Sequence, residues 1–232
     1  MALIMIRPEK AVVPIFETPN PKASPIFLGT GFFILPDPIL VTANHVIQNS
    51  VNDLCIAVID KSIKLFRAFT ITNDDQRDLA LLKVPDYHPE FSFMLGSPEK
   101  IVFNKPVISY DYGTTESIEG KIKLSPATRI GNIVRTLDLV DLYDKAGEEI
   151  LELSFPVLRG ASGGPLFGAA GEDLIWGILK GNVAHELSPA QIEKIYDEEG
   201  KVEEETRFLL PQGLAVHVGH LRELLTRQKI TH

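Results

Sequence analysis

The stretch GTGFFILPDPILVTANHVI, residues 29–47, holds two short strand-like runs joined by a turn and ends just past a histidine. Phe, Ile, Val and Thr dominate both runs, and this composition is typical of β-strands. The Pro-Asp-Pro tripeptide at 36–38 separates the runs and favours a turn. The sequence therefore predicts two neighbouring strands, with His45 directly after the second.

Similar runs recur along the chain in two groups, on either side of LGSPEK at 95–100. The first group comprises AVVPIF, GTGFFIL, ILVTANHV, LCIAVID, LFRAFTI and LALLKV. The second comprises KPVISYDYG, GKIKLSPATRI, GNIVRTL, EILELSFPV, GGPLFG, LIWGILKG and GLAVHV. The 17 Gly and 16 Pro among 232 residues fit many short strands and turns. We therefore predict an all-β protein with two barrels or sandwiches, at residues 1–100 and 101–232.

Two segments carry helix signals. In SPAQIEKIYDEE, residues 188–199, Ser188 is a good N-cap and Gln191 completes a capping box. In GHLRELLTRQ, residues 219–228, three leucines form one apolar stripe: Leu221, Leu224 and Leu225. The sequence predicts a helix in each segment, the second packed on the body of the protein.

Composition excludes several classes of function. The net charge of −8, from 23 basic and 31 acidic residues, argues against nucleic-acid binding. No apolar run approaches the roughly 20 residues of a membrane helix, and the opening MALIMIRPEK is too short for a signal peptide. Cys55 is the only cysteine, so no disulfide can form within the chain. We expect a cytoplasmic protein with neither nucleic-acid nor membrane partners.

The stretch RGASGGPLFG at 159–168 places Ser162 among closely spaced glycines. Alone, this pattern fits a flexible turn. A serine nucleophile needs a base, usually a histidine that a carboxylate orients. His45 and Asp78, which opens the run DLALLKV, both precede Ser162, and His, Asp, Ser is the chain order of chymotrypsin. The three residues together favour nucleophilic catalysis.

The flanks of these residues carry a family resemblance. GTGFFILPDPILVTANHVI resembles the segment leading to the histidine of trypsin-like serine proteases, and RDLALLKV resembles the aspartate motif of their bacterial HtrA-like branch. Other similar segments are LGSPEKIVFNKPVISYDYG, LSFPVLRGASGGPLFG, LIWGILKGN and GLAVHVGHLRELL. The resemblance covers roughly residues 10–226 and implies two six-stranded antiparallel β-barrels with a C-terminal helix. The sequence given ends at His232, so we expect no appended PDZ domain.

The resemblance implies a role for each site residue. Ser162 is the nucleophile, His45 the base and Asp78 its orienting carboxylate, while the backbone N–H groups of Gly160 and Ser162 form the oxyanion hole. No cofactor or metal is implied. Two positions depart from common family patterns, because Asn44 stands where Ala is common and Ala161 cannot pair with a new N-terminus as an aspartate does in digestive members.

The substrate pocket follows from the same resemblance. Its walls are expected at Pro156, Val157, Leu158, Arg159, Lys180, Gly181 and Asn182. Because Pro156 at the pocket floor is not acidic, we expect a small or apolar substrate residue there rather than Lys or Arg.

Other interpretations stay open or are disfavoured. The leading one is a serine endopeptidase acting on proteins or peptides. The contrasting one is a latent or non-catalytic scaffold that binds a protein partner, activating or otherwise, through the cleft or the acidic segment 185–207. A nucleophile elbow of α/β-hydrolases needs a helix after Ser162, where GGPLFG predicts a strand. His217 and His220 lack metal-site spacing and fit a strand end before a helix.

Overall fold

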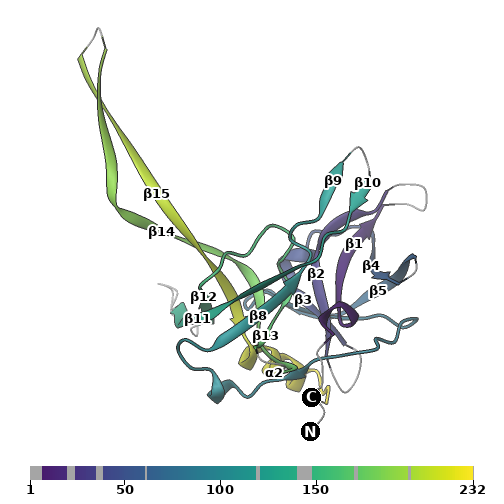
Figure 1. The fold of residues 1–232 in the computed structure, drawn as a ribbon. Coiled ribbons are helices and arrows are strands. Elements are labelled where there is room, and N and C mark those ends of the chain that lie inside the picture. The colour runs from purple at the N-terminus through teal and green to yellow at the C-terminus, as the bar shows by residue number, and fades with distance from the viewer. Residues whose placement is uncertain are drawn as a thin grey trace.

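A computed structural model describes most of the chain (Figure 1). It covers residues 7–19, 24–34, 39–60, 62–118, 121–139, 148–169, 172–197 and 200–231. Two short 3₁₀ helices lie in it, η1 (Pro8–Lys10) before the first strand and η2 (Pro98–Lys100) between the two barrels. No helix among the described residues is both long and apolar enough to cross a membrane.

The first barrel closes from six antiparallel strands in the order β1-β2-β3-β6-β5-β4. Its strands are β1 (Val12–Thr18), β2 (Ile26–Ile34), β3 (Ile39–Ala43), β4 (Asp53–Ile59), β5 (Ile63–Asp74) and β6 (Leu79–Lys83). A one-turn helix, α1 (Asn44–Ile47), follows β3 directly. The predicted pair of strands before His45 is therefore confirmed, with the histidine on this helical turn.

The second barrel closes in the order β8-β11-β12-β15-β14-β13, since β13 pairs with both β14 and β8. Its strands are β8 (Pro106–Asp111), β11 (Ala127–Leu139), β12 (Glu148–Leu153), β13 (Pro165–Gly168), β14 (Leu174–Asp197) and β15 (Gly200–His217). Strand β7 (Met94–Leu95) runs parallel to β14, and β9 (Glu116–Ile118) pairs with β10 (Lys121–Lys123) in a separate hairpin. The predicted fold class is confirmed.

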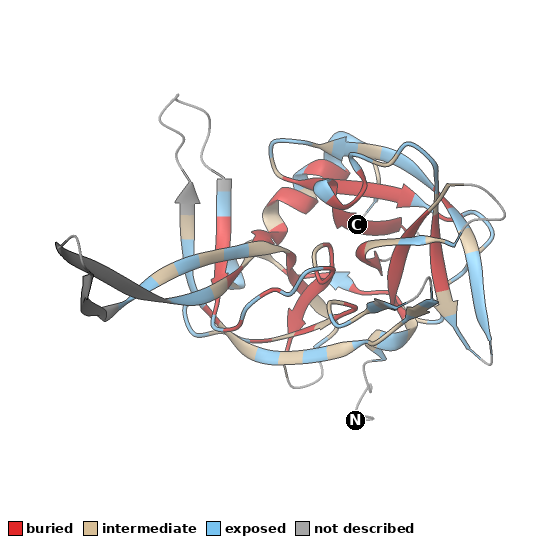
Figure 2. Cartoon of the chain, turned by 90° about the horizontal axis from the view of Figure 1, so that it is seen from above, coloured by how far each residue is buried: buried red, intermediate tan, exposed pale blue. Residues whose placement is uncertain are grey.

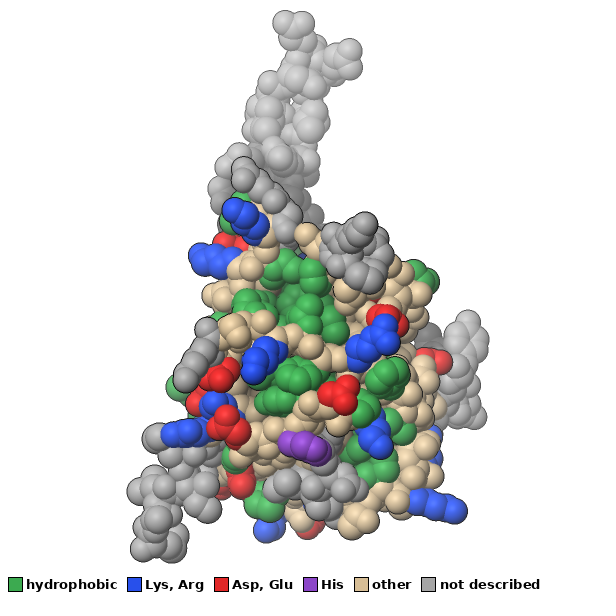
Figure 3. Space-filling view, turned by 90° about the vertical axis from the view of Figure 1, so that its right-hand side faces the viewer, with side chains coloured by type: hydrophobic (Ala, Val, Ile, Leu, Met, Phe, Trp, Pro, Cys, Tyr) green, Lys and Arg blue, Asp and Glu red, His purple; other side chains and the backbone are tan. Residues whose placement is uncertain are grey.

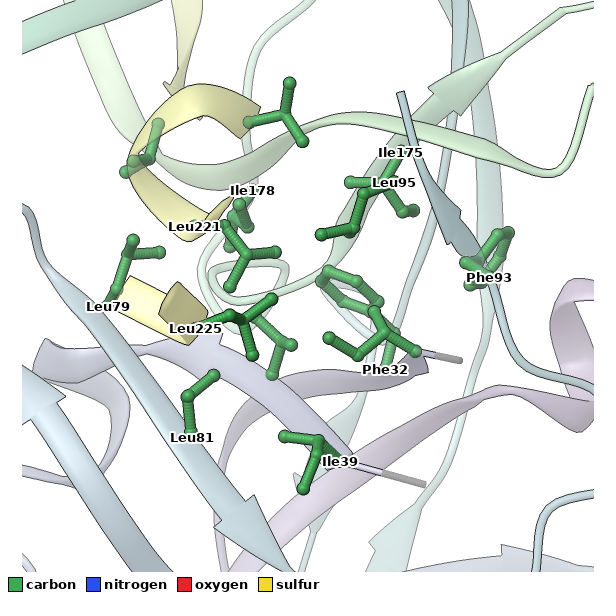
Figure 4. Packing of buried hydrophobic residues seen from close by; sticks show 14 of the residues in the cluster. Phe32, Ile39, Leu79, Leu81, Phe93, Leu95, Ile175, Ile178, Leu221 and Leu225 are labelled. Atoms are coloured by element: carbon green, nitrogen blue, oxygen red, sulfur yellow. The ribbon is translucent and has the colours of Figure 1, made fainter. Parts of the chain in front are cut away.

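One apolar cluster joins the two barrels and helix α2 (Val218–Arg227). Figure 4 shows Phe32 and Leu81 from the first barrel, Ile178 from the second, and Leu221 and Leu225 from α2 converging there. All five are fully buried. In Figure 2 the buried segments lie on the strands of both barrels and on the C-terminal helix. The predicted C-terminal helix and its leucine stripe are confirmed.

The helix predicted at 188–199 is wrong for residues 188–197, and residues 198–199 lie outside the described ranges. Residues 174–197 and 200–217 form one long antiparallel hairpin, which projects beyond the second barrel as β14 and β15 (Figure 1). The pairing begins inside the barrel, at Gly177 and His217, and continues outward to Asp197 and Gly200. The capping signals were local preferences, and an existing strand ladder overrides such preferences. The domain boundary at residue 100 stays a prediction.

Candidate active site

The structure brings His45 and Asp78 into direct contact. Strands β3 and β6 pair side by side, with Ala43 opposite Leu79, so the residues next to each lie together. One carboxylate oxygen of Asp78 accepts from the backbone N–H of His45 at 2.8 Å, and the other lies 2.7 Å from Nδ1 of the same residue. The backbone N–H of Asn44 donates to the Asp78 carbonyl at 3.0 Å, so the backbones on either side of the His45–Asp78 contact are also hydrogen-bonded to each other.

This contact determines which histidine nitrogen is available. An ionised carboxylate only accepts hydrogen bonds, so Nδ1 of His45 carries the proton directed at Asp78. The neutral ring then has its lone pair on Nε2, on the side away from the carboxylate. Asp78 is 9% exposed, so water competes little for this hydrogen bond.

Asn44, the departure from the family pattern, has a structural partner. Its side chain is 2% exposed, and Nδ2 donates to the Asp75 carboxylate at 2.7 Å. Asp75 lies in the turn that precedes Asp78, so this bond connects the histidine turn to the aspartate turn a second time.

The loop before Ser162 is a tight turn. The N–H of Ala161 donates to the Leu158 carbonyl at 3.0 Å, and Gly160 has a φ of 89° at the third position. That φ is typical of a type II turn, whose central peptide is flipped relative to a type I turn. A Cβ at position 160 would lie 2.6 Å from the Phe27 ring, so glycine is needed both for its conformation and for space.

Thr30, in β2 of the first barrel, is hydrogen-bonded to this loop. Its hydroxyl donates to the Gly160 carbonyl at 2.7 Å and accepts from the N–H of Tyr112 at 3.1 Å. Its backbone N–H donates to the Ser162 carbonyl at 3.0 Å. Thr30 is fully buried, and sequence reasoning missed it because a threonine between glycines in a strand carries no chemical signal of its own.

Gly163 lies against the first barrel. A Cβ there would sit 2.1 Å from the Thr42 hydroxyl and 2.2 Å from the Thr30 carbonyl, and the residue has a φ of 82°. The Thr42 hydroxyl donates to that same carbonyl at 2.7 Å. The glycines around Ser162 therefore let the serine loop of the second barrel approach β2 and β3 closely.

Ser162 itself is hydrogen-bonded to the neighbouring strand. Its Oγ donates to the Lys180 carbonyl at 3.0 Å, and no hydrogen bond joins it to His45, although both residues are described. The N–H groups of Gly160 and Ser162 donate to no acceptor within the described ranges. The three predicted residues thus come from the two facing barrels, with the serine turned toward β14.

The predicted pocket walls are joined by Asn182. Its amide accepts from the Val157 N–H at 2.7 Å and donates to the Val157 carbonyl at 2.6 Å. Pro156 and Arg159 are exposed, and a Cβ on Gly181 would meet nothing within 4 Å. The segments 156–159 and 180–182 therefore lie side by side as predicted, and their role in selecting substrate stays a prediction.

A cavity of about 900 Å³ opens beside the histidine. His45 and Gly160 line it together with Leu28 of β2, Gly113 and Arg159. The cavity therefore borders both the proposed base and the turn that precedes the serine.

The two late histidines have structural roles, as predicted. His217 accepts from the N–H of Gly219 at 3.1 Å and so caps the first turn of α2, while Nε2 of His220 accepts from the N–H of Glu149 at 3.1 Å. Burial lowers the pKa of His217 below its ordinary value.

Comparison with known proteins identifies the family. Residues 29–175 match the model described as a trypsin-like peptidase domain. The chain belongs to the trypsin-like peptidase family. The match includes the two threonines, the histidine, the aspartate and the serine described above.

Relatives of this trypsin-like domain include bacterial proteases. Serine protease Rv3671c of Mycobacterium tuberculosis is 30% identical over 72% of this chain and 43% of its own length. A protein named "Probable periplasmic serine endoprotease DegP-like", from Bartonella henselae, is 31% identical over 65% of this chain and 27% of its own. The chain therefore spans less than half the length of these curated relatives.

The fold is also that of solved proteases. The HtrA-type protease AlgW, solved with a decapeptide, superposes with a TM-score of 0.65 at 18% identity, covering 95% of this chain and 64% of AlgW. The resemblance to the HtrA-like branch that the sequence carries is confirmed.

Proposed function

We propose that this trypsin-like domain is a serine endopeptidase that hydrolyses peptide bonds through an acyl-enzyme. The single observation that supports this most is the two-point contact between Asp78 and His45, at 2.8 and 2.7 Å. This contact holds the histidine ring in the orientation and tautomer that a general base for serine needs.

The reaction follows from this arrangement. Ser162 Oγ leaves the Lys180 carbonyl, gives its proton to Nε2 of His45 and attacks the substrate carbonyl carbon. The oxyanion that forms accepts from the N–H groups of Gly160 and Ser162. His45 then protonates the leaving amine as the C–N bond breaks, and a water molecule, deprotonated by the same ring, hydrolyses the acyl-enzyme. Asp78 stabilises the imidazolium without taking its proton.

The substrate is proposed to be an extended polypeptide with a small or apolar residue in the pocket between 156–159 and 180–182. AlgW, of which the chain covers 64%, was solved with a decapeptide, and a peptide ligand is consistent with a polypeptide substrate. Hydrolysis of a peptide library by the wild type and not by Ser162→Ala tests the proposal. Dominant cleavage after Lys or Arg would contradict the proposed pocket.

A second candidate is a latent protease that a protein partner activates. The hydrogen bond from Ser162 to the Lys180 carbonyl favours it, because the serine must rotate before His45 can take its proton. A folded wild type that hydrolyses peptides only after a partner is added would support this candidate. Full activity of the isolated chain would exclude it.

The cytoplasmic location expected from the lone cysteine is kept as a proposal. Cys55 is buried, with Thr18 Oγ1 3.1 Å from its Sγ, so it adds no support for an oxidising compartment. Fractionation of cells that make the native protein tests the location, and recovery with periplasmic markers would contradict it.

A further inference from the structure

An apolar groove of about 280 Å³ lies outside the catalytic centre, between the first barrel and residues 121–124 of the β9–β10 hairpin and the chain after it. Phe16 of β1 and Ala57 of β4 are buried at 3% and 1% exposure and form its floor. Its walls come from β5 and from the β10 segment: Ile63, Leu65, Ile122 and Leu124. Figure 3 looks at this side of the molecule, where hydrophobic side chains gather in patches.

The walls of the groove are open to solvent. Ile63 is 59% exposed and Leu65 is 48% exposed, although both are large aliphatic residues on one strand. Ile118 of β9, close in the chain to the β10 wall, is 57% exposed. Gathered exposed apolar side chains beside a groove are typical of binding surfaces.

The groove adjoins the 900 Å³ cavity beside His45 and Gly160. Ser24, Pro25 and Ile122 line both. A polypeptide that lies in the cavity therefore has the groove within reach, next to these three shared residues. Pockets of about 300–1,000 Å³ bury ligands of drug size, so the cavity accommodates several residues before the groove begins.

The position of His45 decides which part of a substrate enters. The acyl part lies in the pocket between 156–159 and 180–182, and the leaving amine must lie where His45 protonates it. His45 and the groove residues Ser24, Pro25 and Ile122 line the same cavity, whereas none of the predicted acyl-pocket residues lines the groove. We propose that the groove binds apolar side chains of the substrate on the C-terminal side of the scissile bond, several residues beyond it. This inference rests on the proposed function.

Charge does not select the occupant of the groove. The nearby carboxylate, Glu17, lines the neighbouring cavity, and its Oε1 already accepts from the N–H groups of Val51 and Asn52 and from the Asn52 side chain, at 2.7 to 3.0 Å. The groove residues carry no charge. Aliphatic or aromatic substrate side chains are therefore the chemistry that fits it.

Two peptides test the groove. Both peptides have the same sequence on the acyl side of the scissile bond. On the leaving side, counted from the scissile bond, the third to fifth residues are drawn from Leu and Phe in the apolar peptide and from Ser and Gly in the polar peptide. We expect the wild type to prefer the apolar peptide by about tenfold in kcat/KM, and Leu65→Asn to lose that preference. A short substrate with a fluorophore amine directly after the scissile bond should be hydrolysed equally by both. Ile130→Asn, an exposed site on β11 outside the groove, is the matched control and should keep the preference.

The outcomes separate this inference from the proposed function. If Leu65→Asn keeps the preference, the groove does not bind the substrate. If no peptide is hydrolysed but Ser162→Ala protein binds the apolar peptide, and adding Leu65→Asn weakens that binding, the groove is supported and the proposed activity fails. A third outcome is that the wild type is a dimer without peptide preference and Leu65→Asn is a monomer. This result would show that a second copy of the chain fills the groove, and it would overturn the inference.

Discussion

Asp78 is the residue on which the catalytic geometry depends. Its backbone φ is 57°, in the left-handed region where aspartate and asparagine are tolerated better than most residues. In this conformation its two carboxylate oxygens reach the ring and the backbone N–H of His45. The backbone conformation and the chemistry of this position therefore favour the same residue type.

Asp78→Asn should keep the fold and lose most of the turnover. Asparagine tolerates the same φ, but its amide group favours the wrong tautomer of His45, and the same change in chymotrypsin-type enzymes lowers kcat by about 10⁴. Peptide hydrolysis and thermal unfolding are measured together. Unchanged turnover in a folded variant would remove Asp78 from the mechanism.

Thr30→Val should lower kcat while changing KM less. Valine has the same shape but leaves the Gly160 carbonyl and the Tyr112 N–H without their partner, at a cost of about 1–3 kcal/mol for each unsatisfied buried group. We expect kcat to fall more than KM rises, because the turn that presents the oxyanion donors loses its support. Thr30→Ser should restore kcat, and failure of that rescue would mean the hydroxyl only fills space.

Gly160→Ala tests the turn itself. Its Cβ would lie 2.6 Å from Phe27 in a backbone conformation that alanine rarely adopts. Loss of one oxyanion donor costs about 10²–10³ in kcat, and we expect a loss of that size. Gly181→Ala, where the Cβ meets open space, serves as the control for stability. Equal activity of Gly160→Ala and the wild type would contradict the assignment.

At the scale of elements, strands and helix α2 could be predicted from the sequence, and the β14–β15 hairpin could not. Short runs of β-branched and aromatic residues between turns identify strands because each buries one face in a barrel. The segment 188–199 instead carries a capping box and helical spacing, which are local signals. Its pairing with β15 extends the strand pairing that begins inside the barrel. The residues of the segment alone do not reveal this partner strand.

A buried carboxylate joins three strands at the base of this hairpin. Glu152 of β12 is 1% exposed, and it accepts from Arg135 Nε of β11 at 2.6 Å and lies 2.8 Å from His185 Nε2 of β14. Burial opposes ionisation, but the hydrogen bonds from Arg135 and His185 outweigh it and lower the pKa of Glu152 below the usual 4.5. The ionised form is therefore the one that the fold stabilises.

This lowered pKa predicts an acid-sensitive contribution to stability. Because the folded-state pKa lies below the unfolded value, the stabilisation is complete above about pH 4.5 and is lost as the pH falls toward the folded-state value. The Tm of the wild type should exceed that of Glu152→Gln at pH 7, and the difference should shrink below pH 4.5. A difference that is constant from pH 7 to 3 would contradict the assignment.

At the scale of the whole molecule, the two barrels unfold as one unit in this account. Their shared cluster includes the fully buried Leu225 of α2, and Arg222 of the same helix donates to the carbonyls of Leu95 and Gly96 between the barrels, at 2.9 and 3.0 Å. The facing barrels supply different members of the proposed catalytic group. We therefore expect their relative position to affect catalysis as well as stability.

Leu225→Ala should lower both properties. Truncation of a buried leucine costs about 2–5 kcal/mol, and here the cavity opens between the barrels. Urea unfolding should show one transition at a lower midpoint, and kcat should fall although Leu225 lies outside the catalytic group. Two separate transitions in the wild type would mean that the barrels unfold independently.

The order and flanks of His45, Asp78 and Ser162 predict them as the chemical residues of the site, since a nucleophile, a base and a carboxylate are recognisable residue types. The residues that support them could not be predicted in this way. Thr30 acts through the backbone carbonyl of Gly160, in a distant segment of the other barrel, and only the folded structure reveals that contact. Thr42 in turn donates to the Thr30 carbonyl on the neighbouring strand.

Labelling of the purified protein with a fluorophosphonate, read by peptide mass spectrometry, tests the central claim most directly. This reagent reacts with a serine only where a base and oxyanion donors activate it. We expect one adduct, at Ser162, that Ser162→Ala abolishes and Asp78→Asn slows. Folded wild-type protein that stays unlabelled, or that is labelled elsewhere, would contradict the account.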